Sequence, residues 1–287
     1  MYNSRFFCHN NFVPVIKKNS NKQYQKQKIM SLQFEQFKSL HYADNLFVLP
    51  NAWNAKSALL LEQQGFPAIA TSSAAVAESL GYGDGEQMLF EEYLAVIKRI
   101  ISVIHVPLTV DIETGYGKTD NDIFVNIKKL AGLGVAGINI EDSIITKTGR
   151  VLKDAKAFAN TIEFIKNKFE SDHSKLFINI RCDTYILNVD NKQQETNHRL
   201  KIYASTGADG IFLPGIADEN DIAEAVHNTK LPINVMCIPC LPGFDVLNKL
   251  GVKRVSMGPF MFTKVYREIA SLSQLIIKNN NFSALLS

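Results

Sequence analysis

The feature that most constrains the fold of this chain is a regular alternation of strand-like and helix-like segments, which begins after a predicted amphipathic helix at residues 31–41. Short runs rich in β-branched and apolar residues occur around residues 46–50, 67–71, 108–111, 137–141, 176–181, 210–214, 233–237 and 254–258. Between them, apolar residues recur at the spacing of amphipathic helices, as at Phe90, Tyr93, Leu94 and Ile97. Eight strand–helix units without a break in composition predict an α/β fold of the (β/α)8 TIM-barrel type.

A doubly wound open sheet is the alternative α/β architecture. Such a sheet usually has fewer strands, and it binds nucleotides at a glycine-rich turn directly after its first strand. In this chain the first strand is followed by Pro50, Asn51 and Ala52 instead. The barrel is therefore the preferred prediction.

The first 29 residues differ in charge from the rest of the chain. They carry six of the 31 basic residues and no acidic residue, which leaves 25 basic against 28 acidic residues in 30–287. We expect 1–29 to be a basic, disordered extension and 30–287 to be one barrel domain with C-terminal helices, Met30 being a second candidate start. A nucleic-acid-binding arm and an organelle transit peptide are the other interpretations of the extension.

Apolar segments of the kind that target or cross membranes are missing from the sequence. No apolar run approaches the roughly 20 residues that span a bilayer, and no compact apolar core of the signal-peptide type is found near the start. Four cysteines in 287 residues do not make a disulfide framework. We therefore expect a soluble cytoplasmic protein that binds neither membranes nor nucleic acid.

Two carboxylates one residue apart follow the strand at 108–111. Alternate residues of a strand share a face, so Asp111 and Glu113 converge on one point if the extended backbone continues through both. Adjacent carboxylates repel unless a cation lies between them, and oxygen donors suit Mg2+, with Mn2+ as the alternative ion. The next strand ends in a second acidic pair, Glu141 and Asp142. The pattern predicts a metal site, and a solvated acidic turn is the other interpretation.

Further polar residues stand where the predicted strands end, which is the face on which barrel enzymes carry their active sites. They are Asn51, Ser72, Ser73, Arg181 and Asp183, together with Asp84 in the loop after the second strand. Several acids around one arginine predict a metal beside a guanidinium that binds a small anionic carboxylate. Alternatively, Arg181 only neutralises Asp183 or Glu141 in a structural ion pair.

Two common kinds of catalytic residue are missing from this face. None of the six histidines falls at the carboxyl end of a predicted strand. Lysine is also missing from the strands, apart from Lys253 at the entry of the strand at 254–258, which is the opposite rim. Imidazole acid–base catalysis and Schiff-base chemistry are therefore disfavoured.

Five motifs, matched in order over roughly residues 33–275, resemble those of the isocitrate lyase/phosphoenolpyruvate mutase family. They read F-V-L-P-N-A-W-N-A, G-F-P-A-I-A-T-S-S-A-A-V-A-E-S-L-G-Y-G-D-G-E, V-D-I-E-T-G-Y-G, G-I-N-I-E-D-S and I-R-C-D-T. The resemblance implies a Mg2+-dependent barrel enzyme that makes or breaks a C–C or P–C bond next to a pyruvate-like unit. It also implies a homotetramer in which a C-terminal helix packs on a neighbouring subunit.

The resemblance also implies roles for individual residues. The family's metal shell corresponds to Asp84, Asp111, Glu113 and Glu141. Asp111 is the implied direct ligand, and the other three act largely through water. Ser72 and Ser73 correspond to the residues that bind the substrate carboxylate, and Arg181 to the arginine that stabilises the oxyanion or the transferred group. Asn51 is a further candidate for substrate binding at the same mouth.

The loop after the fourth strand departs from the family's lyases. Isocitrate and methylisocitrate lyases carry K-K-C-G-H or K-R-C-G-H there, whereas this chain has S-I-I-T-K-T-G-R at 143–150 and lacks the Cys and the His. The mutase has K-T-N-S, of which Lys147 and Thr148 are kept while Gly149 replaces the Asn. We expect the loop to hinge at Gly149 and to bring Lys147 onto the substrate as a catalytic residue; a flexible surface turn is the alternative.

Three functions are compatible with these residues. The first is a Mg2+-dependent lyase-type enzyme that breaks or forms a C–C bond adjacent to a pyruvate-like unit in a small 2-oxo or 2-hydroxy acid, through an enolate. The second is a phosphonopyruvate or phosphoenolpyruvate mutase or hydrolase. The third is a catalytically silent relative that binds metal and small carboxylates.

Overall fold

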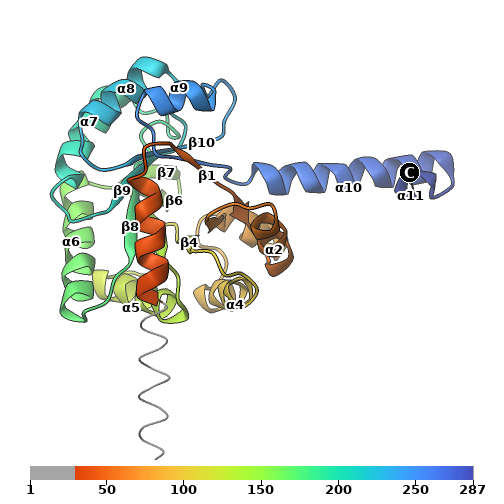
Figure 1. Ribbon diagram of the computed structural model, residues 1–287, viewed down its shortest axis with the longest axis horizontal. Coiled ribbons are helices and arrows are strands. Elements are labelled where there is room, and N and C mark those ends of the chain that lie inside the picture. The colour runs from red at the N-terminus through yellow and green to blue at the C-terminus, as the bar shows by residue number, and fades with distance from the viewer. Residues whose placement is uncertain (1–29, 287) are drawn as a thin grey trace, which may run out of the picture.

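The computed structural model of the protein describes residues 30–286, so the extension predicted at 1–29 lies outside the described residues. Strands form the centre of this part and helices surround them (Figure 1). The strands are β1 (Phe47–Leu49), β2 (Asn51–Ala52), β3 (Ile69–Thr71), β4 (Leu108–Asp111), β5 (Gly137–Glu141), β6 (Ser143–Thr146), β7 (Gly149–Leu152), β8 (Phe177–Arg181), β9 (Gly210–Leu213), β10 (Ile233–Met236) and β11 (Arg254–Ser256). After a first helix at 30–41, the helices are α2 (Ala55–Gln63), α3 (Ser73–Ser79), α4 (Phe90–Ile101), α5 (Asp120–Leu133), α6 (Ala155–Ser171), α7 (Lys192–Tyr203), α8 (Glu219–His227), α9 (Phe244–Lys249), α10 (Phe260–Asn279) and α11 (Ser283–Leu286).

The central sheet closes on itself through its first strand. Only Pro50, which has no backbone N–H, separates β1 from β2. β1 pairs with β11 and β2 pairs with β3, at the two ends of the strand order β1-β11-β10-β9-β8-β5-β4-β3-β2. Because these two ends are consecutive parts of one strand, the nine segments occupy eight positions around a parallel barrel. The predicted (β/α)8 barrel is confirmed, and the open sheet is excluded.

Local sequence signals explain where the elements lie. β5 is buried along its whole length, as expected for a parallel strand that is covered on both faces. α5 begins at a capping box, in which the Thr119 side chain accepts from the N–H of Asp122 while the Asp122 carboxylate accepts from the N–H of Thr119. It ends at Gly134, whose φ of 100° lies in the left-handed region that glycine adopts without strain.

The helix at 30–41 closes one end of the barrel. Its Phe34 and Phe37 pack with Phe47 and Phe177 in a separate buried cluster, and His41 stacks on Phe177 with ring centroids 4.2 Å apart. Phe47 and Phe177 are the first residues of β1 and β8. The helix therefore fills the end of the barrel opposite the carboxyl ends of the strands, and the helix predicted at 31–41 is confirmed.

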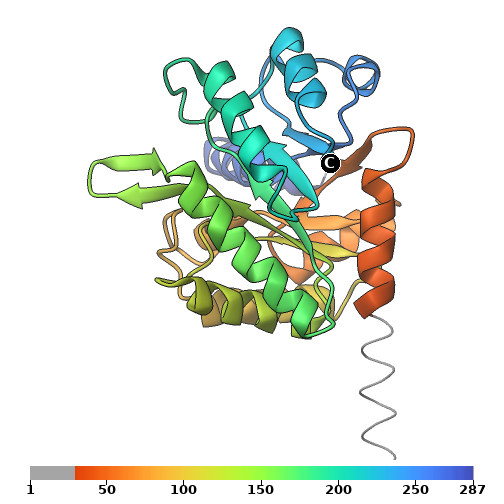
Figure 2. The same cartoon turned by 90° about the vertical axis from the view of Figure 1, so that its left-hand side faces the viewer.

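The segment after β5 is a hairpin rather than the loop that we predicted. β6 and β7 pair antiparallel, with Ser143 opposite Leu152 and Thr146 opposite Gly149, and the hairpin projects from the barrel (Figure 2). The β-branched residues Ile144, Ile145, Thr146 and Val151 favour strands, which accounts for the difference. The closing motion of this segment stays a prediction.

The long helix α10 extends away from the barrel (Figure 1), and Phe262 is the one buried residue that it carries. Of the helices at residues 30–286, none combines the length and the apolar character that crossing a membrane requires. The cytoplasmic location stays a prediction.

Candidate active site

A pocket of about 200 Å³ opens at the carboxyl ends of the barrel strands. It is smaller than the roughly 300–1,000 Å³ that drug-sized ligands occupy, so it suits a small molecule. Six of the nine predicted site residues line the pocket, namely Asn51, Ser72, Ser73, Asp84, Asp111 and Arg181. The remaining lining residues include Asn139, Phe212, Met236 and Ser256.

Asp111 is the last residue of β4 and has one free carboxylate oxygen. Its Oδ2 accepts a hydrogen bond from the Ser73 hydroxyl at 2.9 Å, whereas its Oδ1 is buried and has no partner among residues 30–286. The Tyr93 hydroxyl donates to the Asp111 backbone carbonyl at 2.8 Å and thereby holds the strand end in place. Burial raises the pKa of Asp111, and Arg181 acts in the opposite direction. A buried oxygen without a donor is what a cation ligand offers before the cation binds.

Glu113 turns away from the position that strand alternation predicted. The strand ends at Asp111, and Glu113 has a φ of 51°, so the extended backbone does not continue through both residues. The Glu113 carboxylate instead accepts from the Glu86 N–H and from the Tyr116 hydroxyl, each at 2.7 Å. The pKa of Glu113 is raised to about 7, chiefly by burial and also by Asp84 and Asp111, while the hydrogen bonds from Tyr116 and Glu86 act in the opposite direction. The extended backbone that the predicted convergence required is not present, because the chain turns between the two acids.

Glu141 lies at the end of β5 between two arginines. The Nη1 of Arg181 is 2.9 Å from its Oε2, and the Nη1 of Arg150 contacts its Oε1. Burial raises the pKa of Glu141, while the two guanidinium groups act in the opposite direction. Glu141 does not line the pocket, so any role that it has at a metal there is indirect.

Arg181, the last residue of β8, is held by carboxylates on two sides. Its Nε donates to Asp183 at 2.6 Å, its Nη2 donates to the same carboxylate at 3.3 Å, and its Nη1 pairs with Glu141. Burial lowers the pKa of Arg181, but Glu141, Asp183 and Asp111 outweigh burial and raise it, so the side chain stays cationic. The structural ion pair that we considered is present, and Arg181 lines the pocket as well.

Arg150 is a residue of this region that our sequence analysis missed. From β7 it contacts Glu141, it donates to the Ser143 hydroxyl at 3.1 Å, and it lies 3.8 Å from Asp183 and 3.5 Å from Asp84. We had predicted a loop at 143–150, and a loop gives no reason to expect Arg150 to fold back onto Glu141. The strand-forming residues on both sides of the turn are the signal that would have predicted the hairpin.

Lys147, which we predicted to be catalytic, lies at the exposed tip of the same hairpin. It does not line the pocket in this conformation. The hairpin therefore brings Arg150, and not Lys147, to the carboxylates of the site. A catalytic role of Lys147 stays a prediction.

Asn51 and Ser72 line the pocket but also have structural partners. The Asn51 Nδ2 donates to the Thr71 carbonyl at 2.9 Å, and its Oδ1 accepts from the N–H groups of Met257 and Gly258, each at 2.9 Å. Asn51 thus ties the first barrel strand to the segment after the last one. The Ser72 hydroxyl caps α3 by accepting from the Ala75 N–H at 3.3 Å.

Asp142 supports the site from outside the pocket. Its Oδ1 accepts from the Asp183 N–H at 2.9 Å, and its Oδ2 accepts from Arg199 at 3.0 Å and from the Tyr203 hydroxyl at 2.8 Å. Asp142 and Asp183 are both fully buried. Through these contacts α7, which carries Arg199 and Tyr203, fixes the backbone that presents Asp183 to Arg181.

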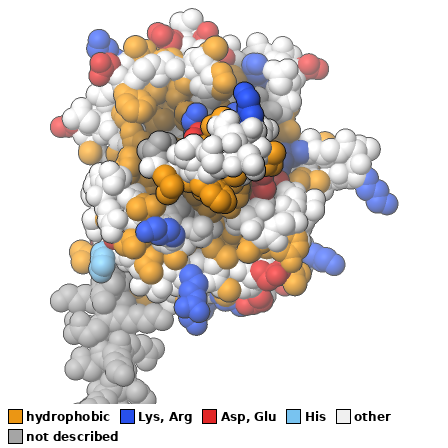
Figure 3. All heavy atoms as spheres, turned by 90° about the vertical axis from the view of Figure 1, so that its right-hand side faces the viewer, with side chains coloured by type: hydrophobic (Ala, Val, Ile, Leu, Met, Phe, Trp, Pro, Cys, Tyr) orange, Lys and Arg blue, Asp and Glu red, His pale blue; other side chains and the backbone are white. Residues whose placement is uncertain are grey.

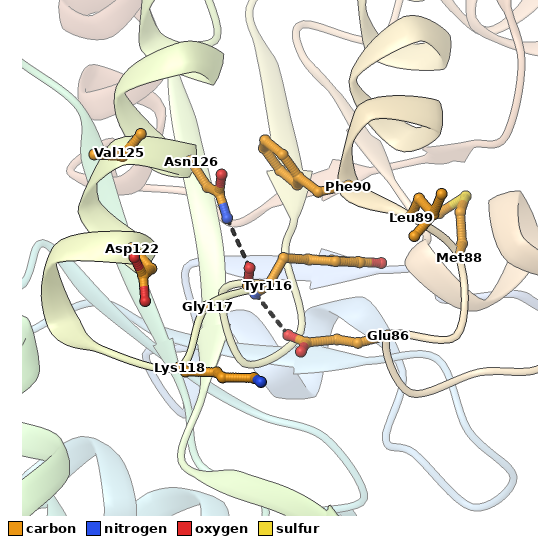
Figure 4. A pocket seen from close by; sticks show the side chains of 10 residues that line it. All are labelled: Glu86, Met88, Leu89, Phe90, Tyr116, Gly117, Lys118, Asp122, Val125 and Asn126. Atoms are coloured by element: carbon orange, nitrogen blue, oxygen red, sulfur yellow. Dashed lines mark hydrogen bonds between the residues drawn. The ribbon is translucent and has the colours of Figure 1, made fainter.

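A second, shallower pocket of about 570 Å³ lies between α4, α5 and the turn after β4 (Figure 4). In this pocket the Glu86 carboxylate accepts from the N–H groups of Thr114 and Tyr116, at 3.0 and 2.8 Å, and from the Thr114 hydroxyl at 2.6 Å. Glu86, Glu113 and Tyr116 all have positive φ, at 59°, 51° and 54°, which is strained for residues other than glycine. Through its hydrogen bonds to Thr114 and Tyr116, Glu86 connects the loop that contains Asp84 to the turn after β4.

The acids of the site are arranged around one possible direct metal ligand. Among residues 30–286, no group of three or more His, Cys, Asp or Glu side chains is placed to hold a metal ion. Asp111 lines the pocket and its buried Oδ1 has no partner among residues 30–286, and Asp84 also lines the pocket, with half of its side chain exposed. The donor set therefore fits a hard cation that takes one carboxylate and completes its coordination with water and substrate oxygens.

Comparison with known proteins connects this geometry to a family. The sequence model of the phosphoenolpyruvate phosphomutase family matches residues 37–277. The chain belongs to this family. It is 37% identical to an uncharacterised protein of Mycobacterium tuberculosis over 77% of this chain and 81% of that protein. It is 28% identical to a 2-methylisocitrate lyase of Aeropyrum pernix over 66% of this chain and 60% of that protein.

Solved structures support the same assignment. The crystal structure of a candidate phosphonomutase from Burkholderia cenocepacia superposes with a TM-score of 0.79 at 31% identity, and the match covers 87% of this chain and 98% of that one. The chain is thus a member of the isocitrate lyase/phosphoenolpyruvate mutase superfamily of enzymes, which contains lyases and phosphonomutases. The resemblance found in the motifs is confirmed.

Proposed function

We propose that this phosphomutase-family protein is a Mg2+-dependent lyase-type enzyme that acts next to a pyruvate-like unit in a small 2-oxo or 2-hydroxy acid. The reaction breaks or forms a C–C bond through an enolate. One observation carries the proposal: the small pocket joins Asp111, whose Oδ1 has no partner among residues 30–286, to the cationic Arg181. A metal ion held on Asp111 and the guanidinium of Arg181 could together bind an anionic 2-oxo acid.

Asp111 would hold Mg2+ directly, and Asp84, Glu113 and Glu141 would act on it through water, with Mn2+ as an alternative ion. The free Oδ1 of Asp111 and the position of Asp84 in the pocket support this assignment. A bound divalent cation polarises oxygens of the substrate and stabilises negative charge that develops on them. Burial is the main cause of the raised pKa values of Asp111 and Glu113, neighbouring acids contribute to both, and a bound cation would lower both.

The protein's own side chains supply binding and charge stabilisation. Ser72 and Ser73 line the pocket with Asp111 and would bind the substrate carboxylate, Ser73 by turning its hydroxyl from Asp111 to the substrate. Arg181 is oriented by Asp183 and Glu141, so its guanidinium is preorganised to stabilise the enolate oxygen that forms when the bond breaks. The pocket excludes large substrates by its volume.

Phosphonopyruvate or phosphoenolpyruvate mutase or hydrolase chemistry is the second candidate. One observation favours it: Arg150 and Arg181 both contact Glu141, so two guanidinium groups converge beside the pocket. A pair of arginines suits a dianionic phosphonate better than a single carboxylate. Transfer of the phosphoryl group would then depend on the hairpin that carries Arg150.

A screen of small acids tests the proposal. The protein would be assayed with Mg2+ on 2-oxo and 2-hydroxy acids, including phosphonopyruvate, with release of pyruvate or phosphate as the readout and EDTA as the control. Pyruvate release that EDTA abolishes is the expected result, and phosphate release from phosphonopyruvate would support the second candidate. Binding of Mg2+ and oxalate without turnover of any substrate would identify a catalytically silent relative.

We also propose that the protein forms a homotetramer through α10. The helix projects from the barrel with apolar side chains exposed along it, among them Val265, Tyr266 and Ile269 at 39%, 45% and 52%. The side from which it projects shows hydrophobic side chains on the helix and around its base (Figure 3). Light scattering after size-exclusion chromatography should give four chains for the native protein and fewer for Ile269→Lys. A monomeric native protein would contradict the proposal.

A further inference from the structure

Beneath the pocket, the interior of the barrel contains a layer of polar side chains. Asn139, Asn179, Asn234 and Arg254 come from four different strands, β5, β8, β10 and β11. Their exposed fractions are 7% for Asn139 and 0% for the other three. Barrel interiors are usually filled by branched apolar residues, so a polar layer at this depth requires a physical explanation.

These side chains form one directed chain of hydrogen bonds. The Asn234 Nδ2 donates to the Asn179 Oδ1 at 2.7 Å, and the Asn179 Nδ2 donates to the Asn139 Oδ1 at 2.9 Å. The same Asn139 Oδ1 accepts from the Nη2 of Arg254 at 3.1 Å. A guanidinium has donors and no acceptor, so the amide atom that faces it must be the oxygen. Arg254 therefore decides which way the Asn139 amide points.

The Asn139 amide also carries the Nδ2 group, which can donate hydrogen bonds. Of the four polar residues, Asn139 is the one that lines the pocket, and it pairs with Asp111 in the register of β4 and β5. Its Nδ2 donates to no acceptor among residues 30–286. With its oxygen fixed toward the interior, Asn139 presents an amide donor to the floor of the pocket next to Asp111.

Arg254 adds a positive charge below this floor. It forms no ion pair within residues 30–286, and it lies over the Phe212 ring at 5.9 Å and near the Nε2 of His41 at 3.4 Å. The pKa of Arg254 is lowered to about 9, because burial outweighs the opposite effect of Asp111, so the group remains charged at neutral pH. A buried guanidinium without a carboxylate is costly for folding, which is a reason to look for its role in function.

We propose that Asn139 is a further substrate-binding residue, whose Nδ2 donates a hydrogen bond to a carboxylate or enolate oxygen of the bound acid. Arg254 is a positioning residue that fixes the Asn139 amide and does not touch the substrate. The inference rests on the proposed function, because it takes a small anionic acid as the occupant of the pocket. It adds a contact to substrate oxygen that comes from the barrel interior and not from the loops.

Isothermal titration of oxalate in the presence of Mg2+ tests the role of Asn139. Asn139→Asp keeps an acceptor for Arg254 and Asn179, so the variant should fold with a melting temperature at least equal to that of the native protein. It loses the donor and places a negative charge at the floor, so the Kd for oxalate should rise at least tenfold. Thr109→Val is the control, since Thr109 is equally buried in the barrel, its hydroxyl has no partner among residues 30–286, and it does not line the pocket.

The role of Arg254 is tested by two substitutions of similar size. Arg254→Lys keeps a donor for the Asn139 oxygen and should retain oxalate affinity within about threefold. Arg254→Met removes the donor, leaves the amide free to flip and should weaken oxalate at least tenfold. A merely structural role would lower stability in both variants without this difference in affinity.

Each outcome is decisive. A folded Asn139→Asp variant that binds oxalate as tightly as the native protein would overturn the inference and leave the proposed function intact. If Asn139→Asp does not fold, Asn139→Ala gives the same comparison, and an unchanged Kd overturns the inference. Absence of any oxalate binding by the native protein would overturn the proposed function and the inference with it.

Discussion

The guanidinium of Arg150 reaches back from β7 to the carboxylate of Glu141 at the end of β5, and the two side chains are 16% and 1% exposed. This contact joins the projecting hairpin to the acids at the mouth of the barrel. Any movement of the hairpin changes the charge around Glu141, because Arg150 moves with it. The position of the hairpin and the charge balance of the candidate site are therefore coupled through Arg150.

Replacement of Arg150 tests this coupling. Arg150→Ala should lower turnover at least tenfold, which corresponds to about 1.4 kcal/mol of transition-state stabilisation, because Glu141 loses one of its two cationic partners. Arg150→Lys keeps the charge and should retain a larger share of kcat. Measurement of kcat for both variants checks this, and equal losses in the two would show that charge is not what Arg150 supplies.

Lys147 tests whether the hairpin closes over the substrate. If it does, Lys147 brings a positive charge onto the anionic acid, and Lys147→Ala should lower turnover at least tenfold with little change in Mg2+ affinity. Trypsin cleavage at Lys147 and Arg150 should slow when Mg2+ and oxalate are bound, oxalate standing in for the pyruvate enolate. Full activity of Lys147→Ala, with equal cleavage rates with and without ligands, would make Lys147 a bystander.

Asp111 is the most direct test of the metal assignment. Asp111→Ala should abolish turnover and Mg2+ binding while leaving the melting temperature of the metal-free protein nearly unchanged, since the carboxylate accepts one side-chain hydrogen bond, from Ser73, and its buried Oδ1 has no partner among residues 30–286. Asp84→Ala is the control, because Asp84 is about half exposed and would act through water, so a smaller loss is expected. Near-normal turnover of Asp111→Ala would refute the assignment.

The buried pair of Asp142 and Arg199 should matter for stability. Arg199→Leu leaves the fully buried Asp142 carboxylate without its cation and should cost about 3–5 kcal/mol of unfolding free energy. The double variant with Asp142→Asn leaves no unpaired buried charge and should recover part of that loss. Urea denaturation of both proteins measures the difference, and a loss below about 1 kcal/mol in the single variant would contradict the prediction.

His41 should make the fold sensitive to mild acid. Burial lowers the pKa of His41 well below its usual value, Arg254 lowers it further, and the hydrogen bond to the Phe37 carbonyl acts in the opposite direction. The unfolded chain therefore takes up a proton below about pH 6.5 that the folded chain does not. Protonation of His41 in the unfolded chain should by itself lower the unfolding free energy by about 1.4 kcal/mol for each pH unit below 6.5.

Replacement of the imidazole isolates this contribution. His41→Phe keeps an aromatic ring against Phe37, Phe47 and Phe177 and should remove the slope contributed by His41 between pH 6.5 and 5. His227→Gln, which removes an exposed imidazole on α8, is the control. An unchanged slope in His41→Phe would assign the acid sensitivity to other groups.

The barrel and most of the residues that face its mouth follow from patterns that the sequence shows directly. Strands and amphipathic helices are short-range patterns, and the carboxyl ends of parallel strands must meet at one face of a barrel. Asp111 and Arg181 end β4 and β8, so their approach follows once the strands are assigned. The motifs then sufficed to identify the family.

The partner that each of these side chains takes became known only from the folded protein. The Glu113 carboxylate accepts a hydrogen bond from the N–H of Glu86, 27 residues earlier, because the loop after α3 packs against the turn after β4. Arg150 rather than Lys147 meets Glu141, because the hairpin turns the chain back on itself. Arg254 orients Asn139 across 115 residues of sequence. The contact between Arg254 and Asn139 joins two groups that no local pattern relates, because only closure of the barrel places β11 and β5 around one interior.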